Sequence, residues 1–252
     1  MLTPAFAALS LDDLRRGHSH NDYEQRHPLH DALDQHLYSV EADIWLRRGK
    51  ILISHIGWSF KGSLEDLYLN PLQQLVNRQG SVQGDGRIFF LWLDIKDGSA
   101  ALRAALHQLL TKYPMLTTFG GRQGVPGMVT VILTGDEDSK AKFVSEHSER
   151  RACRDSNYIS VKDAPGDDRW SWYAIKWSDY MHWNGNGPLT PGERQRLVKV
   201  TALAHSKGRR LRFWGVPGLE VVWKAALDAG VDQVSADDLP RLHRFLETNT
   251  VL

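Results

Sequence analysis

The sequence predicts an α/β protein and, within that class, a (β/α)8 TIM barrel with some distortion. The length of 252 residues suits one barrel, since barrels of about 250 residues fold as a single unit. Strand-like apolar runs alternate with helix-like stretches about eight times along the chain. No linker rich in Pro, Gly and Ser divides it, so we expect one domain over residues 1–252 with an N-terminal extension at 1–13. A doubly wound open sheet is the alternative.

Apolar patterning locates the individual elements. The segment 88–93 is almost continuously apolar, which is typical of a strand buried on both faces of a parallel sheet. Apolar stripes at helical spacing predict helices at 100–113, 219–227 and 239–246. The expected strands lie at 38–45, 51–55, 87–95, 128–134, 157–161, 172–177, 210–214 and 231–235, with a first strand that ends in the segment 17–23.

Composition excludes several classes of protein. Lys and Arg number 31 against 30 Asp and Glu, so a formal charge of +1 provides no field to hold nucleic acid or an anionic membrane. The single Cys153 excludes a disulfide framework and a Cys-rich zinc site. No run approaches the roughly 18 apolar residues of a membrane span. We expect no nucleic-acid partner and no transmembrane segment, and the oligomeric state stays open.

The first ten residues bear on location. Ala5-Phe6-Ala7 is similar to the end of a secretory signal, but no basic stretch or long apolar run precedes it. We therefore expect a cytoplasmic protein by default. A secreted chain whose signal has been removed stays open as the alternative.

Paired polar residues fall where the expected strands end, which is where barrel enzymes place their active sites. Side chains two residues apart on a strand share a face, so each pair points the same way. The pairs are His18 with His20, Glu41 with Asp43, and Asp94 with Lys96. His55 ends a short run that follows the second strand. Alone, each pair has an ordinary explanation as a turn, a solvated rim or a salt bridge, but together they favour a functional site.

The three carboxylates define the expected chemistry. Glu41, Asp43 and Asp94 would repel one another in one mouth unless a cation lies between them. Ligands that are all oxygen favour one hard divalent ion, Mg²⁺ or Ca²⁺. Imidazoles beside such an ion can take up and release protons near neutral pH.

These residues resemble a known family. The segments His20-Asn-Asp-Tyr23, Val40-Glu-Ala-Asp-Ile-Trp45, Ile53-Ser-His55 and Leu93-Asp-Ile-Lys96 are similar to the phosphatidylinositol-phospholipase-C-like phosphodiesterases, which include the glycerophosphodiester phosphodiesterases. Within them, the opening His-Ser-His-Asn-Asp-Tyr looks most like the group named for altered inheritance of mitochondria. The segment 210–217, followed by 229–232 and 236–239, resembles the last two strands of the glycerophosphodiesterases.

The resemblance implies a distorted TIM barrel and a phosphoric diester hydrolase or lyase of lipid metabolism. It implies a metal site on Glu41, Asp43 and Asp94 with Asn21 as a fourth ligand. It also implies catalysis by His20 and His55 and phosphate support by Lys96. His18 is an extra histidine that could take the role of His20. The implied substrate is a small-molecule or lipid phosphodiester, cleaved by water or by its own hydroxyl.

Aromatic residues near later strand ends are candidates for substrate binding. Trp177, Trp183 and Trp214 lie at or after such ends, and simple packing stays open for the first two. The rival enzyme class is a His-x-His zinc hydrolase barrel of the amidohydrolase or polymerase-and-histidinol-phosphatase type, with zinc on His18 and His20. A binding barrel that has lost catalysis is the alternative from another class. The head group, the choice between hydrolysis and cyclisation, and the choice between Mg²⁺ and Ca²⁺ stay open.

Overall fold

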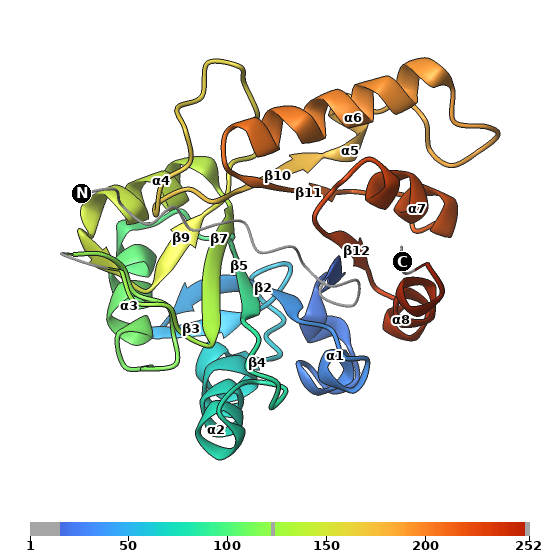
Figure 1. Cartoon of the computed structure of the whole chain (residues 1–252). Helices are drawn as coiled ribbons and strands as arrows, with labels where there is room; N and C mark the ends of the chain where they lie inside the picture. Colours follow the sequence, from blue (N-terminus) through green and yellow to red (C-terminus); the bar gives the residue numbers. More distant parts are fainter. Residues whose placement is uncertain (1–15, 122–123, 250–252) are drawn as a thin grey trace.

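The computed structural model describes residues 16–121 and 124–249. They form a mixed α/β fold in which helices surround a central, mostly parallel group of strands (Figure 1). The expected extension at 1–13 and the signal-like segment lie outside the described residues. No helix in the described part of the chain is long and apolar enough to cross a membrane.

The main sheet is a ladder of parallel strands with an antiparallel addition. The ladder runs in the order β12 (Val234–Ala236), β1 (Gly17–Ser19), β2 (Ser39–Arg47), β5 (Phe89–Ile95), β7 (Val129–Gly135) and β9 (Ala152–Arg154). The addition consists of β3 (Lys50–Ile53), antiparallel to β2, and β4 (Gly62–Ser63), antiparallel to β3. Two further pairs stand apart: the parallel β10 (Trp172–Lys176) and β11 (Arg210–Trp214), and the antiparallel β6 (Phe119–Gly120) and β8 (Glu149–Arg150).

The predicted α/β class is confirmed, whereas a closed barrel is not. The ladder stops at β9 on one side and at β12 on the other, and the β10–β11 pair forms its own sheet. Isolated parallel bridges join Arg154 to Trp170 and Arg212 to Gln233, one beside each gap. The end strands β9 and β12 are only three residues long, which leaves few hydrogen bonds for closure.

One expected strand is wrong. We expected a strand at 157–161, but that segment is irregular and the strand is β9 at Ala152–Arg154. The Asn157 side chain is held by Lys140, and the Ser156 hydroxyl donates to the Tyr158 carbonyl, so the chain turns there. The sequence hides β9 because only Ala152 and Cys153 are apolar between charged neighbours.

Some of the helices begin at residues whose side chains cap them. Ser99 caps α3 by accepting from the Leu102 amide, and Asp136 caps α4 by accepting from the Ser139 amide. The helices are α1 (His30–Asp34), α2 (Asn70–Gln79), α3 (Ala100–Leu110), α4 (Glu137–Glu146), α5 (Trp177–Tyr180), α6 (Pro191–Ser206), α7 (Glu220–Asp228) and α8 (Leu239–Thr248). Short 3-10 and π turns occur at Asp22–Glu24 and Glu65–Leu69.

Two apolar clusters lie on opposite faces of the strands. The larger one lies between strands and helices and includes Val40, Ala42 and Ile44 of β2, as the alternation predicts. The smaller one, which we call the inner cluster, lies on the face that also carries Asp94. It consists of Phe90, Trp92, Phe119, Ile132, Cys153, Trp172 and Ala174. Within it the rings of Trp92 and Trp172 meet edge to face, 5.2 Å apart between centroids.

Candidate active site

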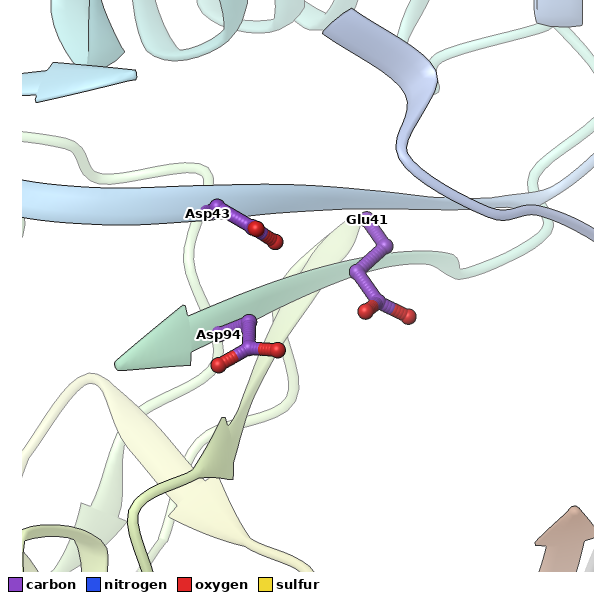
Figure 2. A group of neighbouring side chains, drawn as sticks. All are labelled: Glu41, Asp43 and Asp94. Atoms are coloured by element: carbon purple, nitrogen blue, oxygen red, sulfur yellow. The ribbon is translucent and has the colours of Figure 1, made fainter. Parts of the chain in front are cut away.

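Three carboxylates from two neighbouring strands converge beside the inner cluster. Glu41 and Asp43 share one face of β2, and Asp43 lies directly opposite Asp94 in the parallel register of β2 and β5. One oxygen of each carboxylate lies within 4.8 Å of the others. Figure 2 shows the three side chains pointing into one space. The strand alternation seen in the sequence therefore brings the three predicted ligands together.

Lys96 holds one oxygen of each aspartate. Its Nζ lies 2.8 Å from Asp94 Oδ2 and 3.3 Å from Asp43 Oδ2. The other oxygens, Oδ1 of Asp43 and Oδ1 of Asp94, are buried and accept no hydrogen bond. Buried polar atoms are normally paired, so these two oxygens are suited to a further cation. The donor set fits a hard divalent ion because all of it is oxygen.

The charges of this cluster also favour a bound cation. Burial raises the pKa of Asp94 to about 6, against the opposing effect of Lys96, and the charges of Glu41 and Asp43 raise it further. Burial also raises the pKa of Asp43. The pKa of Lys96 rises in turn, because Asp94 and Asp43 outweigh the effect of its burial. One ammonium is thus shared by two aspartates.

Gly135 makes room for Asp94. It ends β7 with a φ of 87°, and a Cβ atom placed there would lie 2.0 Å from Asp94 Oδ1. A side chain at this position would therefore displace the carboxylate, and the positive φ is itself unfavourable for residues other than glycine.

Glu41 is held separately, by a residue that the sequence analysis missed. Arg212 of β11 is 1% exposed, and its Nη1 lies 2.6 Å from Glu41 Oε2. Its guanidinium lies over the Trp92 ring, 4.2 Å from the centroid. Burial would raise the pKa of Glu41, but Arg212 and then His18 lower it well below its usual value. The sequence does contain a pattern that could have identified Arg212. Arg210, Arg212 and Trp214 alternate along one strand, so Arg212 shares a face with Trp214.

His18 lies at the base of the site. It is fully buried, with Nε2 2.9 Å from Glu41 Oε2 and Nδ1 2.8 Å from Ser39 Oγ. Burial, followed by the charge of Arg212, lowers the pKa of His18 to about 3. Arg212 Nη1 also lies 2.6 Å from His18 Nε2, so the ring is enclosed by Ser39, Glu41 and Arg212. His18 therefore orients Glu41 and has no surface on which to meet substrate.

Two other histidines are accessible, and each has its Nδ1 beside a carboxylate. His20 Nδ1 lies 3.0 Å from Asp237 Oδ1, and His55 Nδ1 lies 3.0 Å from Asp43 Oδ2. The side chains are 36% and 59% exposed, respectively. A carboxylate at Nδ1 fixes the orientation of an imidazole and leaves Nε2 for another partner. This arrangement can accept and donate protons.

Asn21 lies next to His20 in a left-handed backbone conformation, with φ of 46°. Its Oδ1 accepts a hydrogen bond from the Tyr23 hydroxyl at 3.1 Å, and that hydroxyl lies 3.4 Å from His55 Nδ1. Tyr23, to which the sequence analysis gave no role, thus links Asn21 and His55. A pocket of about 410 Å³ opens beside them, lined by His20, Asn21, Glu24, Gln25 and Asp237.

The three candidate tryptophans have different surroundings. Trp177 is 2% exposed and belongs to the cluster between strands and helices, which fits the packing that the sequence analysis left open. Trp183 packs against that cluster and donates from Nε1 to the Gly187 carbonyl at 3.1 Å. Trp214, at the end of β11, is 40% exposed. Of the three, Trp214 has the most accessible ring.

The surroundings of the His-x-His pair differ from those of a zinc site. Within residues 16–121 and 124–249, the acidic, His and Cys side chains that converge in a group of three or more are Glu41, Asp43 and Asp94. His18 faces Glu41 and Ser39, whereas His20 faces Asp237. The cluster therefore offers carboxylate oxygens rather than imidazole nitrogens.

The fold and this cluster fit a class of phosphodiesterase domains, and the comparisons with known proteins agree. A family described as the AIM6-like phosphodiesterase domain matches residues 14–155, and the chain belongs to that family. The matched segment includes the three carboxylates, Lys96 and the three histidines of the site.

Curated relatives carry the name "Altered inheritance of mitochondria protein 6". The protein from Eremothecium gossypii is 28% identical over 92% of this chain and 69% of its own length. The one from Lachancea thermotolerans is 26% identical over 88% of this chain and 63% of its own length. The chain therefore spans about two thirds of the length of these relatives, whose names state no substrate.

Proposed function

We propose that this chain is a divalent-cation-dependent phosphodiesterase that acts by general acid–base catalysis with two histidines. One observation carries the proposal: the unpartnered Oδ1 atoms of Asp43 and Asp94 lie in the cluster that also orients His55. A site that needs one more cation, next to an accessible imidazole, suits an anionic substrate. The family assignment supports the same class of reaction.

In this proposal Glu41, Asp43 and Asp94 hold one Mg²⁺ or Ca²⁺, with Asn21 as a further ligand. When bound, the ion supplies Lewis-acid stabilisation of charge on the phosphoryl group. Lys96 adds a fixed positive charge beside Asp94, where it can donate to a phosphoryl oxygen. His18 and Arg212 keep Glu41 in place from below.

His20 and His55 carry the proton transfers. One imidazole takes a proton at Nε2 from the attacking hydroxyl, and the other gives a proton to the leaving alkoxide oxygen, so that charge balances. The attacking group is water or a hydroxyl of the substrate, and the latter would yield a cyclic phosphate. The substrate is a glycerophosphodiester or a phospholipid-like diester.

We also propose that the parallel strands close into a distorted (β/α)8 barrel. The two isolated bridges support closure, since each lies beside one gap in the ladder. The contact between Arg212 and Glu41 supports it as well, because it links β11 directly to β2 across the inner face.

The test is a panel of phosphodiesters followed by phosphorus NMR, with chelator and with added Mg²⁺ or Ca²⁺. We expect cleavage only with the cation, and the product spectrum will identify the bond broken and any cyclic phosphate. Asp43→Asn should lose activity because it removes one of the three negative charges that attract the cation. Asp138→Asn, at an exposed carboxylate of α4, is the matched control. Full turnover in a verified metal-free preparation, or no turnover of any diester, would contradict the proposal.

A further inference from the structure

Strands β10 and β11 contribute side chains to the same interior as the carboxylates. The Trp172 ring of β10 packs against Trp92 of β5, and Arg212 of β11 contacts Glu41 of β2. Alternation places Lys176 on the face of Trp172 and Trp214 on the face of Arg212. Lys176 and Trp214 are partners in the parallel register. Both end their strands, on the side where Asp43 and Asp94 also lie.

Lys176 and Trp214 form an accessible pair. The Lys176 ammonium lies 5.4 Å from the centroid of the Trp214 ring, which is a cation–π contact. The lysine is half-buried and the tryptophan 40% exposed. Within residues 16–121 and 124–249, no hydrogen bond or ion pair to a carboxylate is found for Lys176. By contrast, Lys96 contacts two carboxylates.

Several other accessible lysines lie beside a carboxylate, whereas Lys176 lies beside an aromatic ring. Lys61 pairs with Glu24, Lys142 with Asp138, and Lys224 with Asp228. Lys176 instead keeps its ammonium at an aromatic ring beside the mouth of the site. Its charge is therefore available to a ligand that enters there.

The position relative to the carboxylates indicates which part of a ligand would reach it. Arg212 contacts Glu41, and Trp214 and Asp43 each lie two residues further along their strands. Lys176 and Trp214 therefore lie at the same end of the strands as Asp43 and Asp94, and on the same inner face. A phosphate at the carboxylates would direct one of its alcohol groups toward the Lys176–Trp214 pair.

We propose that Lys176 and Trp214 form a head-group subsite that selects phosphodiesters whose alcohol carries a carboxylate or phosphate. The inference rests on the proposed phosphodiesterase function and names its substrate class. The ammonium attracts a second anionic group through a charge-assisted hydrogen bond. It also covers a face of the ring that would otherwise attract a quaternary ammonium, and it repels that cation.

The test uses three diesters of glycerol phosphate that differ only in the second alcohol, which is glyceric acid, glycerol or choline. kcat/KM is measured for wild type, Lys176→Gln, Lys176→Glu and the control Lys224→Gln. We expect wild type to prefer the carboxylate diester over the choline diester by about tenfold or more, the worth of one charge-assisted hydrogen bond. Lys176→Gln should abolish the preference for the carboxylate diester, and Lys176→Glu should reverse it. Lys224→Gln should keep the preference of wild type.

Calorimetric titration of the same diesters provides a second measurement that needs no turnover. Equal kcat/KM values for the three diesters, or a preference that survives in Lys176→Gln, would overturn this inference while leaving the phosphodiesterase function in place. Absence of turnover for every diester would overturn the proposed function. In that case, equal affinities of wild type and Lys176→Gln for the carboxylate diester would overturn the subsite as well. A loss of affinity in Lys176→Gln that Lys224→Gln does not show would support the subsite.

Discussion

The three histidines of the site differ in exposure and in their partners, and this separates their expected roles. His20 and His55 are accessible and each has a carboxylate at Nδ1, whereas His18 is fully buried against Glu41. We expect His20→Asn and His55→Asn each to lower kcat by about 10²–10⁴, the usual effect of losing a general acid or base. Each variant should also lose one limb of the pH profile of kcat/KM.

His18→Asn should act differently, because His18 is buried against Glu41, which we propose as a ligand of the cation. We expect a smaller loss of kcat together with weaker cation binding, measured by titration calorimetry. If His18→Asn were inactive while binding the cation normally, and His20→Asn kept most of its rate, the two roles would be reversed.

Arg212 and Glu41 form a buried ion pair, which makes the pair sensitive to the loss of one partner. Arg212→Met leaves the Glu41 charge uncompensated, and we expect the free energy of unfolding to fall by about 3–5 kcal/mol. The double variant Arg212→Met/Glu41→Gln removes both charges and should recover a large part of that loss. Denaturant unfolding of the three proteins measures it. Equal stability of the single and double variants would show that the charge is not the cause.

At the scale of elements, the ends of β10 and β11 present two tryptophans in opposite situations. Trp177 is buried between strands and helices, so Trp177→Ala should lower the free energy of unfolding by about 3–5 kcal/mol. Trp214 is 40% exposed, so Trp214→Ala should change stability much less and act on KM instead. Thermal unfolding and steady-state kinetics separate the two effects. A large stability loss in Trp214→Ala would remove the basis for its role in binding.

Helices α3 and α4 meet at a stacked histidine pair that predicts a pH effect on stability. The rings of His107 and His147 lie 3.7 Å apart and nearly parallel. Burial, followed by the nearby His147, lowers the pKa of His107. The unfolded chain therefore binds a proton near pH 6.5 that the folded chain binds less readily, so stability should fall as pH drops below about 6.5.

Chemical unfolding at about pH 7.5 and about pH 5.5 tests this effect. Wild type should lose more stability between the two values than His107→Gln, which keeps the helix but cannot titrate there. Equal losses would assign the pH dependence to other groups.

How far the sequence predicts the site depends on the distance along the chain between its parts. The carboxylates were predictable because alternation within β2 and β5 fixes their faces, and parallel strands end at one edge. The pair between Glu41 and Arg212 was not, because the two residues are 171 positions apart and nothing local relates them. The short strand β9 was missed for a different reason. Its two apolar residues stand between charged ones and form no alternating pattern that would indicate a strand.

At the scale of the whole molecule, the carboxylate cluster connects two central strands of the sheet, so cation binding should stabilise the entire fold. A ligand that binds only the folded state at about 100 times its Kd adds about 2.7 kcal/mol. We expect Mg²⁺ or Ca²⁺ to raise the thermal midpoint of wild type and of Asp138→Asn, and to do so much less in Asp94→Asn. A shift of equal size in all three proteins would indicate that the ion binds elsewhere.

The arrangement of the strands belongs to the scale of the whole molecule, and the sequence predicted it only in outline. The alternation of strands and helices was correct for most elements, yet the ladder has two gaps. Alternation identifies the elements and their order. It does not specify how many hydrogen bonds short strands such as β9 and β12 make with their neighbours, because that depends on how all the strands and helices pack together.

Gly135 carries no functional group, yet it determines where the Asp94 carboxylate can lie. Its missing Cβ is the space that the carboxylate occupies. The site therefore depends on a side chain that is missing. A search for acids, bases and metal ligands does not detect such a position. A designer who transferred the acidic residues and the histidines to another α/β fold, without this glycine, would transfer the chemistry but not the geometry.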